Sequence, residues 1–271
     1  MIGSIAAEFR KIRQRPALPV SVLIIVGIIA LVYVVSYIQA LNPTAGQRAP
    51  VSLIELYPAA FVTNVIPIVP ALIGAIAVVL GALAVGTEFQ WNTIKTQLIQ
   101  GPGRLTNLSG KFVMIGVWMA LLTVTFYAAA ATGSAGVAVL QHHTIAWPAA
   151  SVIGQALGAT WLIAFCYAML GAGLAFVFRQ SAAALGVGLV YVVVIQTILV
   201  GVLNSFFGGS YKWITKLFDS QNASSLTDSF LGTASAKAAL VGPTQAVLVL
   251  LAYIAIFAMV SGILARRRDI A

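Results

Sequence analysis

Charged residues divide the chain into long apolar stretches separated by short polar connectors. The longest stretch without a charge, Phe112 to Phe178, has 67 residues. About 20 apolar residues in a helix cross the ~30 Å hydrocarbon core, so this stretch is long enough for two crossings. Four more charge-free stretches have 28 to 32 residues each: Ala17 to Gln47, Leu56 to Thr87, Gln180 to Tyr211 and Ala238 to Ala265. The pattern predicts a protein embedded in a lipid bilayer.

These stretches predict helices rather than strands. Backbone in lipid must satisfy its own hydrogen bonds, and a membrane barrel would show segments of about ten residues with alternating polarity, which are missing here. His142, His143 and Pro148 break the longest stretch in two. We therefore predict an all-α polytopic membrane protein, one transmembrane domain over residues 1–271. Its six helices are expected at 19–41, 60–86, 112–140, 150–178, 182–204 and 243–264.

The basic residues predict which side of the membrane each connector occupies. Composition excludes a water-soluble fold, since 61% of residues are hydrophobic and 8% charged, and it leaves a net charge of +9. With the N-terminus inside, the inner segments hold eleven basic residues: Arg10, Lys11, Arg13, Arg15, Lys95, Arg104, Lys111, Arg179, Arg266, Arg267 and Arg268. The outer segments hold four: Arg48, Lys212, Lys216 and Lys237. This bias places both termini in the cytoplasm and explains the positive charge without a nucleic-acid partner.

Two segments on the inner side have amphipathic patterns. Residues 1–15 place Ile2, Ile5 and Phe9 at helical spacing, which predicts a helix on the membrane surface, although a basic tail that only fixes orientation is the alternative. The apolar run that follows is longer than the 7–15 residues of a signal peptide, so we expect a retained helix. The connector 86–111 is also amphipathic, with apolar residues at helical spacing: Trp91, Ile94, Leu98 and Ile99.

The connector 205–242 on the outer side mixes aromatic and polar residues, including Tyr211, Trp213 and Lys216. Such a mixture suits the headgroup zone. Two interpretations remain open: a re-entrant or interfacial hairpin that covers the outer end of a cavity, and a simple interfacial anchor. Small residues within the spans, at Gly154 and Gly158 and at Gly74, Ala77, Gly81 and Ala82, predict close helix packing or dimerisation.

The sequence lacks the groups that intramembrane chemistry needs. No predicted span has a charged residue at mid-depth, where each costs about 2.5–3.5 kcal/mol and is usually kept for function. The run Gly103 to Phe112 fails as a P-loop, because six residues separate its glycines where four are needed and Phe112 replaces the required Ser or Thr. Neither an activated nucleophile nor a metal cluster is evident, and adjacent His142 and His143 fit a solvated turn. We expect no catalysis and no cofactor in this chain.

The connector carries the most specific motif of the chain. Glu88-Phe89-Gln90-Trp91-Asn92-Thr93-Ile94-Lys95 is followed by Gly101-Pro102-Gly103-Arg104 and then by Gly110-Lys111. With the basic segment before the first span, six spans and the closing Arg266-Arg267-Arg268, the chain resembles the permease subunits of type-2 ABC transporters. The likeness covers nearly the whole length. Asn92 stands where that family usually has Gly.

The resemblance implies a division of labour between subunits. In that family the connector is a coupling helix that sits in a groove of a separate ATPase subunit, which binds ATP and Mg. A second permease chain is implied, as is location in the bacterial cytoplasmic membrane. The residues of this chain that would contact the ATPase are Glu88, Trp91, Ile94, Lys95, Leu98 and Arg104.

Four polar residues in or near the spans are candidates for lining a transport pathway: Asn64, Gln155, Gln196 and Asn204. Hydrogen bonds between packed helices explain each of them equally well. The absence of charge in the spans favours export of a hydrophobic or amphipathic cargo, such as a drug, peptide or lipid. Two other functions stay open: an independent secondary carrier or channel, which could bind sodium through backbone carbonyls, and a non-transporting immunity or sensor subunit.

Overall fold

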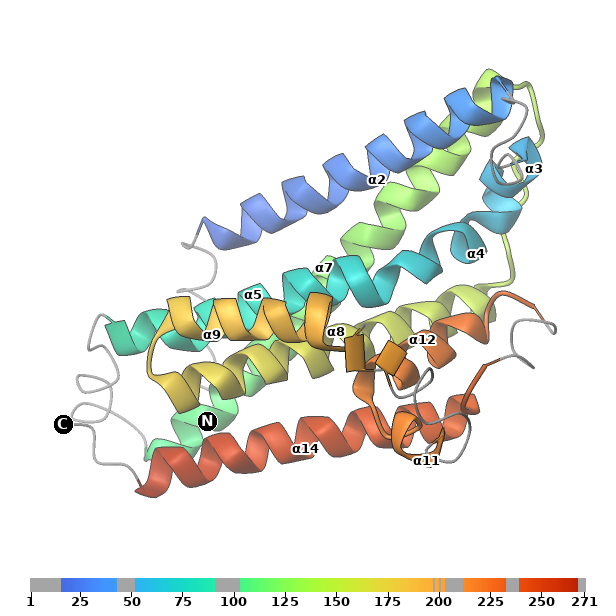
Figure 1. Ribbon diagram of the computed structural model, residues 1–271. Helices are drawn as coiled ribbons and strands as arrows, with labels where there is room; N and C mark the ends of the chain where they lie inside the picture. Colours follow the sequence, from blue (N-terminus) through green and yellow to red (C-terminus); the bar gives the residue numbers. More distant parts are fainter. Residues whose placement is uncertain are drawn as a thin grey trace.

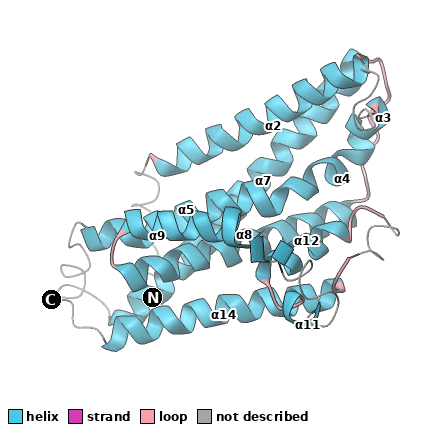
Figure 2. Ribbon diagram, viewed as in Figure 1, coloured by secondary structure: helices cyan, strands magenta, loops and turns pink. Residues whose placement is uncertain are grey.

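The computed structural model describes residues 16–42, 52–90, 103–196, 198–199, 201–202, 212–232 and 239–267. Every regular element in these ranges is helical (Figures 1 and 2), which confirms the all-α prediction. The long helices are α2 (Ala17–Leu41), α5 (Val69–Gln90), α7 (Arg104–Leu140), α8 (Ala150–Phe178) and α14 (Pro243–Arg267). The shorter elements are α3 (Leu53–Leu56), η1 (Pro58–Ala60), α4 (Phe61–Val65), η2 (Ile66–Ile68), α9 (Ser181–Val190), the π-helix η3 (Tyr191–Ile195), α11 (Lys212–Thr215) and α12 (Asp219–Asp228).

Five helical segments of the described chain are long and apolar enough to cross a membrane. They are Ala17–Leu41, Pro58–Gln90, Thr106–Leu140, Ala150–Phe178 and Pro243–Arg266, and each matches one predicted span. The remaining predicted span, 182–204, corresponds to a shorter apolar helix, Ser181–Ile195. Helical residues continue beyond it at 196, 198, 199, 201 and 202.

Helix α8 forms the centre of the bundle. It packs against α5, α7, α9 and α14, and it is the most buried of the five candidate spans. Helices α2 and α14 are the least buried and expose large apolar side chains, among them Leu23, Leu31 and Leu248. Exposed apolar side chains of this kind suit contact with lipid, where water is absent.

The contact between α5 and α8 depends on small residues. A Cβ atom at Gly81 would lie 1.9 Å from the carbonyl oxygen of Ala168, and one at Gly171 would lie 2.2 Å from that of Val78. Glycine is therefore required at both positions for the two backbones to approach this closely. The predicted small-residue face of α5 thus packs within the chain, whereas Gly154 and Gly158 have nothing within 4 Å of their ideal Cβ positions.

Charged residues near the ends of several helices lie at one end of the bundle. Helices α5, α8 and α14 end there and α7 and α9 begin there, on the left of Figure 1. Lys111, Arg179 and Arg266 lie in or beside these helix ends. We call this the basic end, and the opposite end, with the turn around His143, the far end. Both segments predicted to be amphipathic, 1–15 and 91–102, lie outside the described residues.

Candidate functional site

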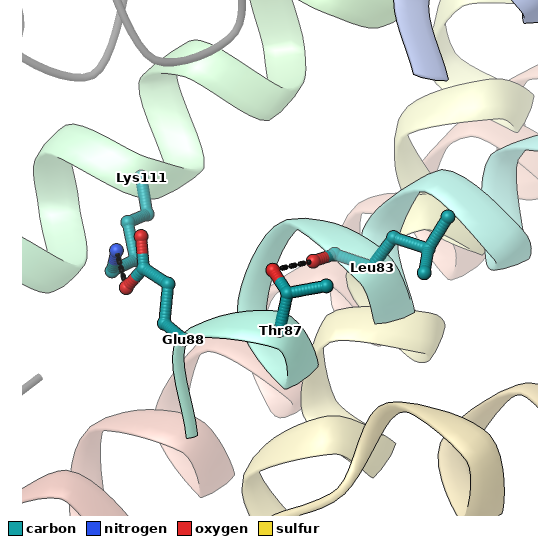
Figure 3. Close-up of polar contacts among 4 residues, drawn as sticks. All are labelled: Leu83, Thr87, Glu88 and Lys111. Atoms are coloured by element: carbon teal, nitrogen blue, oxygen red, sulfur yellow. Dashed lines mark hydrogen bonds and ion pairs between the residues drawn. The ribbon is translucent and has the colours of Figure 1, made fainter. Parts of the chain in front are cut away.

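Glu88 and Lys111 form a buried ion pair at the basic end. Glu88 lies near the end of α5 and Lys111 in the second turn of α7, and the Lys111 Nζ donates to Glu88 Oε2 (Figure 3). Glu88 is 2% exposed and Lys111 is 6% exposed. Beside them, the Thr87 hydroxyl donates to the Leu83 carbonyl at 2.7 Å, within α5. A pair this buried has lost most of its hydration, so each charge depends on the other.

The ion pair joins the two ends of the connector between α5 and α7. Glu88 and Lys111 are 23 positions apart, and the segment between them includes residues 91–102, where the amphipathic helix is predicted. Phe89 adds an edge-to-face contact with Phe176 of α8, with ring centroids 5.6 Å apart. Both ends of the connector are therefore fastened to the helical bundle, one through α5 and the other through α7.

Of the six residues predicted to contact an ATPase subunit, Glu88 is the one whose side chain the structure describes. Its carboxylate faces Lys111 inside the chain. Trp91, Ile94, Lys95 and Leu98 lie outside the described residues. Arg104 is the first residue of α7, and its side chain is not described. The role of the set stays a prediction.

A second polar cluster lies where α12 meets η3, and we call it the Asp219 cluster: Asp219, Tyr191, Gln196 and Asn222. Asp219 is 1% exposed and begins α12. Its Oδ1 accepts two side-chain hydrogen bonds, from the Tyr191 hydroxyl at 2.9 Å and from Gln196 Nε2 at 2.7 Å. A charged acceptor strengthens such bonds, so the cluster joins the start of α12 to η3.

Helix α12 is unusual for a segment packed inside a membrane protein. Eight of its ten residues, DSQNASSLTD, are polar, yet Asn222, Ser225 and Thr227 are buried with Asp219. The helix packs against α14, α8, α5 and η2, and it lies between α8 and α14 in Figure 1. This part of the connector 205–242 enters the bundle, which favours a re-entrant hairpin over a simple interfacial anchor.

The four residues proposed to line a pathway have different environments. Gln196 is 4% exposed and belongs to the Asp219 cluster. Asn64 is half-buried, and its Nδ2 donates to the carbonyl of Glu55 at 3.3 Å, a contact between α4 and α3. Gln155 is exposed on α8, and Asn204 lies outside the described residues. The structure therefore joins one of the four, Gln196, to a buried charge.

Asp219 is the residue that sequence reasoning missed. The predicted spans contain no charge at mid-depth, and that remains true of the spans themselves. The carboxylate instead comes from the connector 205–242, for which the sequence leaves open a re-entrant or interfacial hairpin and a simple interfacial anchor. Its run Ser220 to Thr227 is mostly polar, with Ala223 and Leu226 as the two apolar residues, so hydrophobic periodicity gives little sign that it is buried.

Comparison with known families identifies the class of protein. The model of a family described as ABC-2 family transporter protein matches residues 4–195. The match covers well over half of the chain, and the chain belongs to this family: it is an ABC-2 type permease, a transmembrane component of an ABC transporter. No curated protein gives a significant match. The family match ends before α12, so it includes Glu88 and Lys111 but not Asp219.

Proposed function

We propose that the chain is the permease half of an exporter that is driven by ATP hydrolysed in a separate subunit. The chain crosses the membrane six times, with residues 182–204 as the fifth crossing, and both termini lie in the cytoplasm. Two permease chains associate in the bacterial cytoplasmic membrane, and a pathway forms between them. The cargo is hydrophobic or amphipathic, because the spans lack charged side chains that would bind a highly charged solute.

The buried pair Glu88–Lys111 supports this function most directly. A connector that is pushed by another protein can transmit the push only if its ends are attached to the transmembrane helices. The pair joins those ends to each other, and each partner belongs to a long helix of the bundle. Glu88 therefore serves as a positioning residue that acts through the connector. The other residues of the predicted set would contact the ATPase: Trp91, Ile94, Lys95, Leu98 and Arg104.

The α5–α8 contact gives the push a route to the centre of the bundle. Helix α5 carries Glu88 and meets α8 at Gly81 and Gly171, where the two backbones touch. A contact without intervening side chains has little room for sliding or compression. We propose that ATP-driven closure of the ATPase dimer moves the connector, and that α5 and α8 then move together to change the pathway from inward to outward opening.

Affinity purification of the tagged chain from its native membrane tests the subunit composition. We expect a soluble protein with a P-loop to be recovered together with the permease. The Lys111→Met variant should recover less of it, because the connector loses an attachment. Recovery of the chain alone, in detergents that preserve complexes, would contradict the proposal and favour an independent carrier.

Thiol labelling tests the orientation of the bundle. Cys166, the one cysteine of the chain, is buried, so a Cys166→Ser background gives a blank. Gly103 and Thr144 are exposed at opposite ends of α7 and its following turn. We expect an impermeant thiol reagent added outside cells to label Thr144→Cys. The same reagent should label Gly103→Cys only after the membrane is permeabilised. The reverse pattern would overturn the proposed orientation.

A further inference from the structure

Asp219 lies near the middle of the bundle when depth is counted along the helices. Tyr191, which donates to it, is ten residues after Ser181 at the basic end, which corresponds to about 15 Å of helix. Tyr167 of α8, which interacts with Gln196, is eleven residues before Phe178, or about 16 Å. Both distances are about half of the ~30 Å apolar core. Two different helices therefore place the cluster at the same depth.

The carboxylate of Asp219 is satisfied by neutral groups. Both side-chain donors, Tyr191 and Gln196, are uncharged, and both contact Oδ1. Within the part of the chain that the structure describes, Glu88 and Lys111 form an ion pair, and Asp219 takes part in none. An ionised carboxylate in an apolar interior is costly unless an opposite charge accompanies it, and such groups are usually kept for function.

Asn222 supplies a second acceptor on the same face of α12. It is three residues after Asp219 and fully buried, and residues three apart on a helix are neighbours. Its Nδ2 donates to the carbonyls of Lys216 and Phe218 at 2.8 and 2.7 Å, while its Oδ1 has no partner among the residues that the structure describes. Two carbonyl acceptors on one side fix the orientation of the amide, because the flipped amide would place Oδ1 against both. An unpartnered buried acceptor thus lies beside an unneutralised carboxylate.

We propose that Asp219 and Asn222 form a binding site for the ammonium group of an amphipathic amine cargo. An ammonium group has three N–H donors and one positive charge, which complements a carboxylate and a neighbouring amide oxygen. The site is closed in this structure, with Asp219 and Asn222 buried, and it is reached when the start of α12 separates from Tyr191 and Gln196. The π-helix η3, which carries Tyr191, lies at this joint, and such segments occur often at functional sites. The inference rests on the proposed export function and adds a charge to its cargo class.

Equilibrium binding of radiolabelled octylamine to the full chain in lipid nanodiscs tests the site, with octan-1-ol as the neutral competitor. Octylamine carries an ammonium group on an apolar tail, and octan-1-ol has the same tail without the charge. We expect the wild-type chain to bind octylamine saturably. Octan-1-ol should compete for this binding at least about tenfold less well than unlabelled octylamine does. Equal competition by the two compounds would overturn the proposal, since the tail alone would then explain binding.

Two matched variants on α12 test which carboxylate binds the ammonium group of octylamine. Asp219→Asn removes the charge but keeps an oxygen to accept from Tyr191 and Gln196, and it should weaken octylamine binding by about tenfold or more. Asp228→Asn makes the same change at the other end of α12, where the side chain is half-exposed, and binding should be unchanged. Unchanged binding by Asp219→Asn, or an equal loss in both variants, would contradict the site.

A third variant separates ligand binding from a purely structural role. Gln196→Leu removes a neutral donor from Asp219 and weakens the packing of α12, but it leaves the charge in place. Binding by Gln196→Leu should match or exceed that of the wild type, whereas a structural role predicts a loss that follows the loss of thermal stability. Since the assay needs no ATPase, octylamine binding without a copurifying ATPase would refute the exporter alone. A copurifying ATPase without octylamine binding would refute this site alone.

Discussion

The Glu88–Lys111 pair and the Asp219 cluster are two buried polar sites that satisfy a carboxylate in different ways. At the basic end, the Glu88 carboxylate meets an ammonium group of the same chain. Near mid-depth, the Asp219 carboxylate meets a phenol and an amide, both neutral. The first arrangement pairs opposite charges within the chain and suits a permanent fastening. Among the described residues the second has no positively charged partner, and it therefore suits a group that arrives from outside.

The largest effect that this comparison predicts is the loss of one partner of the ion pair. Lys111→Met leaves the buried Glu88 carboxylate without its ammonium partner, and removal of one member of a buried pair typically costs about 3–5 kcal/mol. The unfolding temperature of the purified chain in detergent, followed by circular dichroism, should fall accordingly. Lys216→Met is the control, because Lys216 is half-buried and its backbone carbonyl, which the substitution keeps, accepts from Asn222.

The double variant Glu88→Gln/Lys111→Met sharpens the same test. Removal of both charges also removes their desolvation cost, so much of the stability should return. If the single variant Lys111→Met unfolds at the wild-type temperature, the two side chains do not depend on each other, and the fastening role of the pair is wrong.

A smaller loss of stability is expected at the Asp219 cluster. Tyr191→Phe removes one hydrogen bond to a charged acceptor, for which mutational data suggest about 1.5–3 kcal/mol. Tyr253→Phe removes a bond of similar length, 3.1 Å, to the neutral carbonyl of Leu217, and should cost about 0.5–1.5 kcal/mol. Thermal unfolding of the two variants under identical conditions gives the difference. Equal losses would indicate that the Asp219 carboxyl carries no charge, contrary to the comparison.

The α5–α8 contact lies between the two sites and should weaken both when it is widened. In Gly171→Ala, the new methyl group would lie 2.2 Å from the Val78 carbonyl oxygen, so the helices must separate. Overpacking of this kind costs about 1–3 kcal/mol. Gly158→Ala on the same helix is the control, because nothing lies within 4 Å of its Cβ position. Since Ala favours the helix over Gly, an unfolding temperature that rises equally in both variants would mean that helix propensity, rather than packing, decides the result.

The sequence alone predicts the all-α class and the place of five spans, because a long uncharged apolar run has few alternatives to a transmembrane helix. It also predicts that Gly81 packs closely, since small residues recur on one face of α5. The remaining span, 182–204, is harder to predict. Residues 181–195 change from α-helix to π-helix at Tyr191, and composition does not show such a change.

The sites are less predictable than the spans. Glu88 stands out through its motif, but its burial against Lys111 depends on how α5 and α7 pack, 23 positions apart in the chain. Gln196 is one polar residue among several in the spans until α12 brings Asp219 to it. A contact between a span and a polar connector is set by tertiary packing, and neither segment encodes it locally.

The smallest effect on stability is expected for substitution of Lys95. This residue lies outside the described residues, and its predicted role in coupling rests on the sequence motif. Surface substitutions usually change stability by less than about 0.5 kcal/mol, so Lys95→Glu should insert and unfold like the wild-type chain. Its effect should instead be on assembly: reversal of the charge should lower ATPase stimulation, or recovery of the ATPase subunit, in the reconstituted complex. Glu88→Ala should lower both stability and stimulation, because it removes a buried partner of Lys111. If Lys95→Glu and Glu88→Ala both support normal transport, residues 88–104 do not couple the chain to an ATPase; if Lys95→Glu alone is normal, coupling depends on the fastening of the connector rather than on its charge.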